Sequence, residues 1–131
     1  LACFLLAHLA YLLAFTSAVP LGTAPALLLP FLALAAALVR LFWSGLGRRL
    51  RLPVLLYTAI IVVMVWQAWA REWTLATTGS ACAAFGATIF MGSDAFLALN
   101  RFRRPFPSAQ ALIMGTYVAA QALIALSIGA T

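Results

Sequence analysis

One acidic residue, Asp94, lies inside an apolar stretch of this chain, in the run FMGSDAFLALN that begins at Phe90. A charged side chain at the centre of a membrane-spanning helix costs about 2.5–3.5 kcal/mol on insertion scales, so a chain that keeps one there usually uses it. The single histidine, His8, also falls in an apolar stretch. A carboxyl group and an imidazole can divide acid–base chemistry between them. Each also has a purely structural interpretation, because Asp94 could pair with a nearby arginine and His8 could be a hydrogen-bonded core histidine.

The familiar motifs of soluble enzymes are missing from the sequence. It contains no glycine-rich phosphate loop, no G-x-S-x-G elbow and no cysteine–histidine zinc spacing. One histidine and two acids are too few for a conventional metal site, so we predict no metal and no cofactor. Ser93 precedes Asp94 directly, which on a helix points the two side chains about 100° apart and argues against a nucleophile–base pair.

Composition places the chain in a membrane. Of its 131 residues, 66% are hydrophobic and only 8% are charged, whereas soluble domains have about 25% charged residues. The net charge of +6 comes entirely from arginine, and these arginines cluster in two short segments, which favours membrane topology over nucleic-acid binding. Cys3 and Cys82 lie in apolar segments and are interpreted as small buried residues rather than a disulfide.

Five hydrophobic segments predict an all-α fold, a polytopic transmembrane helix bundle in a single domain over 1–131. The predicted segments are 1–16, 25–43, 53–70, 73–100 and 109–128, with Pro53 in a first helical turn and Ser108 as an N-cap. The predicted connections include arginine-rich loops at 44–52 and 101–107 and a tight turn at Arg71-Glu72, where Glu72 would be solvated. Because Leu1 already lies in an apolar helical pattern, we expect an N-terminal part to be missing.

The arginines predict the orientation of this bundle. If all five segments span, seven arginines lie on one side and only Arg71 lies on the other: Arg40, Arg48, Arg49, Arg51, Arg101, Arg103 and Arg104. The positive-inside rule makes the seven-arginine side cytoplasmic. Tyr57 and Asp94 then lie at similar depth near that side and could meet. The small residues Gly79, Ala83, Gly86 and Ala87 predict that the fourth segment packs closely in the centre of the bundle.

The order and spacing of several short motifs resemble the YhhN-like lysoplasmalogenase family. These are FLLAHLAY from Phe4, PVLLY from Pro53, the run from Phe90 to Phe102, and YVAAQALIA from Tyr117. The resemblance implies a membrane enzyme of about eight helices, of which this chain resembles the last five. It also implies hydrolysis of the vinyl-ether bond of lysoplasmalogen, a lysophospholipid, to a fatty aldehyde and glycerophosphocholine or glycerophosphoethanolamine.

That reaction suggests roles for the polar residues. It begins with proton transfer to an alkene carbon, for which Asp94 is the expected general acid. The second catalytic group would be His8, acting as base, or an acid in a preceding segment. The residues expected to orient water or substrate are Tyr57, Ser93, Asn100, Tyr117 and Gln121. Arginines of the cytoplasmic side could hold the lipid phosphate.

A non-enzymatic function remains open. A small transporter or lipid-binding bundle could use Asp94 as a proton or cation site, because intramembrane acids are common in such proteins. In either case we expect a multi-pass protein of a bacterial inner membrane, with membrane lipid rather than nucleic acid as its partner. The sequence makes no prediction of oligomeric state.

Overall fold

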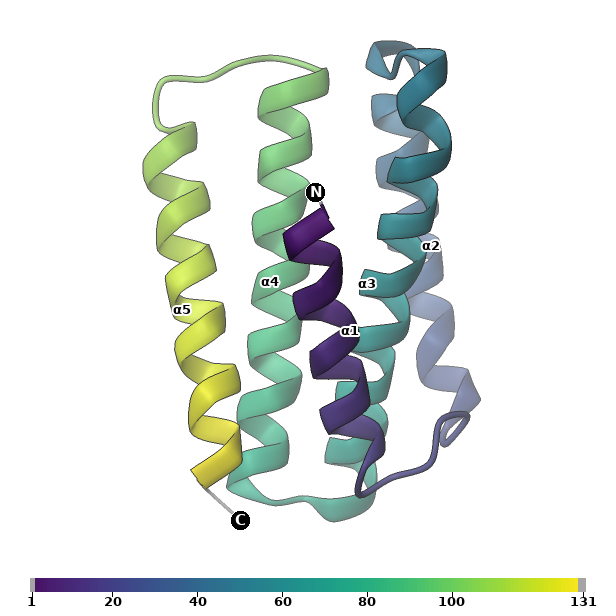
Figure 1. Ribbon diagram of the computed structural model, residues 1–131, viewed down its shortest axis with the longest axis vertical. Helices are drawn as coiled ribbons and strands as arrows, with labels where there is room; N and C mark the ends of the chain where they lie inside the picture. Colours follow the sequence, from purple (N-terminus) through teal and green to yellow (C-terminus); the bar gives the residue numbers. More distant parts are fainter. Residues whose placement is uncertain (1, 130–131) are drawn as a thin grey trace.

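A computed structural model describes residues 2–129 as a bundle of helices that run side by side (Figure 1). The helices are α1 (Ala2–Thr16), α2 (Leu28–Phe42), α3 (Arg48–Leu75), α4 (Thr78–Phe102) and α5 (Ala109–Gly129), with short 3-10 turns η1 (Pro25–Leu27) and η2 (Trp43–Gly45) at the two ends of α2. No strand occurs in this described part, which confirms the all-α prediction. Four of the helical segments are long and apolar enough to cross a membrane, while α1 is shorter. Residue 1 of the first predicted segment lies outside the described residues.

Helix α3 differs from its prediction at both ends. It begins at Arg48 rather than Pro53, because the intervening arginines and leucines are good helix formers and Pro53 removes only one backbone hydrogen bond. It continues through Arg71 and Glu72 to Leu75, so the predicted turn at these two residues is wrong. A charged pair near a helix end is compatible with helical backbone.

The turn between α3 and α4 is made instead by Ala76 and Thr77. Ala76 adopts a left-handed conformation with φ 49, and its N–H donates to the Glu72 carbonyl, which closes α3. Thr77 starts α4 with a capping box, in which its side chain accepts from the Ser80 N–H and the Ser80 hydroxyl accepts from the Thr77 N–H. Glu72 is half-buried, and its carboxylate accepts from the Ser80 hydroxyl at 2.5 Å, so it is not the solvated loop residue that we predicted.

Helix α4 lies centrally, packing against α5, α3 and α2 as predicted. Its small residues permit the close approach of α5. A Cβ atom added to Gly86 would lie 2.9 Å from Ile124 Cγ1, 3.0 Å from Leu123 Cβ and 3.1 Å from the Ala120 carbonyl oxygen. Ala83 and Ala87 are completely buried on either side of this contact. At Gly86, therefore, α5 packs against α4 without room for a side chain.

This contact predicts different effects of two glycine substitutions in the same helix. Gly86→Ala should destabilise the bundle by about 1–3 kcal/mol, the usual cost of overpacking. Gly92→Ala is the matched control, because its added Cβ would meet no described atom within 4 Å. The control should be neutral or stabilising by about 0.5–1 kcal/mol, since alanine favours the helix. Thermal unfolding of both variants in the same detergent tests this, and equal melting temperatures would contradict it.

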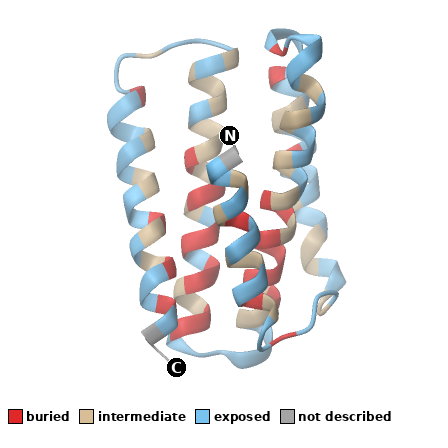
Figure 2. Ribbon diagram, in the orientation of Figure 1, coloured by how far each residue is buried: buried red, intermediate tan, exposed pale blue. Residues whose placement is uncertain are grey.

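Most of the buried residues lie in the middle of the bundle and in the half nearer the turn between α3 and α4 (Figure 2). Met64, Ala68, Ala83, Ala87 and Phe90 are all fully buried there. The other end carries the arginine-rich segments, with Arg40 in the last turn of α2 and Arg101 in the last turn of α4. The predicted separation of Arg71 from the other arginines is thus present in the fold, and the cytoplasmic orientation of the arginine-rich end stays a prediction. Between the packed core and this basic end lies a cavity bounded by α2, α3 and α4.

Candidate active site

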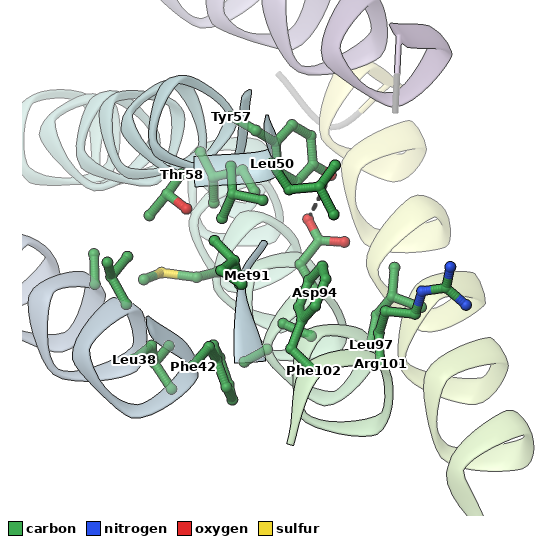
Figure 3. A pocket seen from close by; sticks show the side chains of 17 residues that line it. Leu38, Phe42, Leu50, Tyr57, Thr58, Met91, Asp94, Leu97, Arg101 and Phe102 are labelled. Atoms are coloured by element: carbon green, nitrogen blue, oxygen red, sulfur yellow. Dashed lines mark hydrogen bonds between the residues drawn. The ribbon is translucent and has the colours of Figure 1, made fainter. Parts of the chain in front are cut away.

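The Asp94 side chain, on α4, points toward α3 (Figure 3). There the Tyr57 hydroxyl donates a hydrogen bond of 2.8 Å to Asp94 Oδ2. The predicted meeting of these two residues is confirmed. Asp94 is only slightly exposed, with 14% of its side-chain surface accessible. Within residues 2–129 no arginine lies within 4.0 Å of its carboxyl group, so the described structure does not contain the alternative aspartate–arginine pair.

His8 reaches the same carboxyl group from α1. Its Nε2 lies 3.7 Å from Asp94 Oδ2, and the ring is completely buried. Nδ1 lies 2.5 Å from the Phe4 carbonyl oxygen, which can only accept, so we assign the proton to Nδ1. In the neutral ring, Nε2 then carries a lone pair, and it has no hydrogen-bond partner among the described residues. The site therefore sets an unprotonated nitrogen beside a carboxyl group.

Aromatic side chains fix the orientation of this imidazole. The Phe90 ring stands edge-on to His8 with centroids 4.5 Å apart, and the Tyr57 ring does the same at 5.3 Å. Tyr117 in turn packs edge-on against Phe90 at 5.5 Å and against Phe4 at 5.9 Å. Such contacts add about 0.5–1.5 kcal/mol each beyond the burial of area. The imidazole is thus held by aromatic packing and by one hydrogen bond, at Nδ1.

Hydrogen bonds to α3 and α5 hold α1, and with it His8, in place. The fully buried Gln67 donates from Nε2 to the Val19 carbonyl at 2.6 Å, and Trp66 donates from Nε1 to the Ala24 carbonyl at 3.1 Å. Both bonds anchor the segment between α1 and η1 to α3. The Tyr11 hydroxyl also donates to Gln121 Oε1 on α5. The depth of His8 in the bundle is set by these anchors.

A cavity of about 590 Å³ opens beside Asp94, between α2, α3 and α4. Its wall is largely apolar and includes Leu38, Phe42 and Met91, which Figure 3 shows on the side opposite Tyr57. The polar side chains in the lining are Tyr57, Thr58, Asp94 and Arg101. Ligand sites of this size and composition, apolar with a few convergent polar groups, are typical of small-molecule binding. Asp94 can therefore exchange a proton with a largely apolar molecule bound in this cavity.

Four of the predicted substrate-binding residues do not line this cavity: Ser93, Asn100, Tyr117 and Gln121. Ser93 faces α5, where its hydroxyl donates to the Ile113 carbonyl at 3.1 Å. Asn100 Oδ1 accepts from the Phe106 N–H at 3.3 Å and so shapes the loop after α4. Tyr117 and Gln121 support the position of His8 and Tyr11. Their roles in binding stay predictions, and the contacts that they make are structural.

Sequence reasoning missed the apolar part of the site. Leu38 and Phe42 are four residues apart on α2, and Met91, Asp94 and Ala98 recur on one face of α4. Helical spacing places each set on a common face, but apolar residues at such spacing usually form a core or face lipid. Only the position of α2 relative to α4 shows that these faces enclose a space. Phe90, which holds His8 edge-on, carried no chemical signal in the sequence.

The fold and the site define a polytopic membrane protein with an acid, Asp94, at the wall of an apolar cavity and a buried imidazole, His8, beside that acid but outside the cavity lining. The chain belongs to the YhhN family, whose model matches residues 1–128. It is an integral, multi-pass membrane protein, since four of its helical segments are long and apolar enough to span. The resemblance noted in the sequence is thereby confirmed.

Curated relatives match part of the chain. Lysoplasmalogenase TMEM86A from Bos taurus is 48% identical over 60 residues, which are 46% of this chain and 22% of that protein. Lysoplasmalogenase TMEM86B from Homo sapiens is 51% identical over 53 residues, 40% of this chain and 23% of that protein. The matched stretches thus span less than a quarter of the length of these relatives. No solved structure matches the chain.

Proposed function

We propose that this protein is a membrane hydrolase that cleaves the vinyl-ether bond of lysoplasmalogens. The products would be a fatty aldehyde and glycerophosphocholine or glycerophosphoethanolamine, formed in a bacterial inner membrane. The observation that carries the proposal is the Asp94 carboxyl group, bonded by Tyr57 and facing His8 Nε2, at the wall of an apolar cavity. The names of the relatives TMEM86A and TMEM86B agree with this chemistry.

Asp94 would act first, as the general acid. Its proton goes to the alkene carbon remote from the ether oxygen, and the electron pair of the double bond forms the new C–H bond. A lone pair of the ether oxygen then completes an oxocarbenium ion, whose positive charge the remaining carboxylate of Asp94 stabilises. Tyr57 holds Oδ2 in place through its hydrogen bond, so the carboxyl group does not need to reorient for the transfer.

His8 would act second, as the general base. Water attacks the oxocarbenium carbon, and its proton passes by way of the Asp94 carboxylate to the lone pair of Nε2, because His8 does not itself line the cavity. The product is a neutral hemiacetal. The hemiacetal then collapses: its hydroxyl proton passes to the Asp94 carboxylate, the C–O bond to glycerol breaks, and Asp94 delivers that proton to the glycerol oxygen. The proton held on His8 then returns to Asp94, whose Oδ2 lies 3.7 Å from His8 Nε2. The sum is addition of one water to give one aldehyde and one alcohol.

The proposal is tested with the purified protein, lysoplasmalogen and D₂O. We expect aldehyde release, with one deuterium on the carbon next to the aldehyde group, because that carbon receives the catalytic proton. The matched control substrate is the saturated 1-O-alkyl lysophospholipid, which has no alkene to protonate and should remain intact. Aldehyde without deuterium at that carbon would refute carbon protonation, and absence of aldehyde would refute the activity.

A second candidate function is favoured by the same pair of residues. An acid facing an unprotonated imidazole inside a membrane bundle also suits a non-enzymatic proton carrier. Reconstituted vesicles that contain a pH-sensitive dye distinguish the two functions. Proton flux that requires Asp94, in protein that releases no aldehyde from lysoplasmalogen, would favour the carrier.

A further inference from the structure

The polar groups of the cavity are separated along α4. Asp94 and Arg101 are seven residues apart, which is about two helical turns and about 10.5 Å along the axis, so they lie on nearly the same face. Between them, Leu97 and Ala98 contribute only apolar surface. The cavity thus has an acidic group deep in the bundle, a cationic group at the basic end, and an apolar wall beside them.

Two of the nearby arginines have protein partners for their charge, whereas Arg101, like Arg104, has none among the described residues. The Arg51 guanidinium stacks over the Trp43 ring at 4.6 Å from the centroid, and Arg103 donates to the Leu41 carbonyl at 3.5 Å. Within residues 2–129 the Arg101 guanidinium makes no hydrogen bond or ion pair, and it is the one arginine among the cavity-lining residues. Arg101 is exposed, and Figure 3 shows it beside Leu97 with its guanidinium directed away from the apolar wall, so the side chain must turn to meet a ligand in the cavity. A helical side chain leans toward the N-terminus of its helix, which for Arg101 is the direction of Asp94.

We propose that Arg101 binds the phosphate of a single-chain phospholipid whose hydrocarbon chain occupies the apolar cavity. This inference rests on the proposed function and assigns the phosphate-binding residue of the same site. Guanidinium matches phosphate in charge and in bidentate geometry. The glycerol of such a lipid links the phosphate at the rim to an ether bond that lies deeper, near Asp94. The chain continues along the wall formed by Leu38, Phe42 and Met91.

Kinetics on two substrates tests this assignment. Arg101→Gln should raise the KM for lysoplasmalogen about 10- to 100-fold, in line with the loss of charge-assisted hydrogen bonds, and leave kcat nearly unchanged. The same variant should hydrolyse 1-O-alkenylglycerol, which lacks the phosphate, as well as the unsubstituted protein does. Arg101→Lys should restore part of the affinity. Arg104→Gln is the matched control, because Arg104 lies at the same end but does not line the cavity. An equal loss on both substrates, or an equal effect of Arg104→Gln, would overturn the assignment.

A binding measurement separates this inference from the proposed reaction. The saturated 1-O-alkyl lysophospholipid should raise the melting temperature of the unsubstituted protein and of Arg104→Gln, but not that of Arg101→Gln. Glycerophosphocholine and inorganic phosphate, which carry the phosphate without the chain, should have little effect. Stabilisation by the lipid without any aldehyde release would refute the proposed reaction but support the phosphate site. The assignment of the phosphate site would be refuted if inorganic phosphate alone stabilised the protein, or if the lipid stabilised Arg101→Gln.

Discussion

Asp94→Asn is expected to abolish nearly all vinyl-ether hydrolysis while the protein stays folded in the membrane. The amide retains the shape of the carboxyl group, and its oxygen can still accept the hydrogen bond from Tyr57. It has no acidic proton to give to an alkene carbon. General acid catalysis contributes about 10²–10⁴-fold, so the loss of kcat should be of that order.

Activity and thermal unfolding must be measured on the same purified samples of this variant. Glu72→Gln is the matched control, because it makes the same acid-to-amide change in the other acid of the chain, at the opposite end of the bundle. It should leave both measurements unchanged, since glutamine can still accept from Ser80. If Asp94→Asn keeps its activity, Asp94 is not the proton donor. If the melting temperature of Asp94→Asn falls along with its activity, the role of Asp94 is structural.

His8→Ala should lower kcat about 10²-fold or more, because no other imidazole is present to accept the proton of the attacking water. The substitution also leaves a small space between the rings of Phe90 and Tyr57, which imidazole from the buffer can fill. We therefore expect added imidazole to restore part of the lost rate. A rise of kcat with imidazole concentration is the measurement that checks this.

His8→Phe separates the chemical role of His8 from its packing role. Phenylalanine keeps an aromatic ring against Phe90 and fills the space, so this variant should be as inactive as His8→Ala and should not respond to imidazole. Its melting temperature should stay close to that of the unsubstituted protein. Retention of full activity by His8→Phe would show that the base lies elsewhere, as the alternative of a second carboxylate predicts.

Most of the fold could be predicted from hydrophobic length alone. Apolar segments of spanning length define the helices, and their order defines a bundle, as the match of α5 to its predicted range illustrates. The errors fell at the ends of α3, where Pro53 was interpreted as a start and Arg71-Glu72 as a turn. Prolines and charged residues are weak signals of a helix end near a membrane interface, because both are tolerated inside a helix there. The capping box at Thr77 marked the true start of α4.

The polar part of the site was predictable because burying polar atoms in lipid is costly. Asp94, Tyr57 and His8 stand out in apolar stretches, and topology alone placed Tyr57 and Asp94 at one depth. The direction in which a side chain points was not predictable for Ser93, which faces α5. That direction depends on the rotation of α4 about its axis, which close packing at Gly86 sets. The sequence carries no direct signal for that rotation.

The wall that α2 contributes to the cavity consists of Ala35, Leu38, Val39 and Phe42, without a polar side chain. All the groups proposed to move protons or hold phosphate lie on other helices. Substitutions along this face of α2 can therefore change the length and shape of the hydrocarbon that fits, without altering the reaction. During evolution, the chain preference of such a protein could diverge rapidly through one helix while its chemistry remained fixed in α1, α3 and α4.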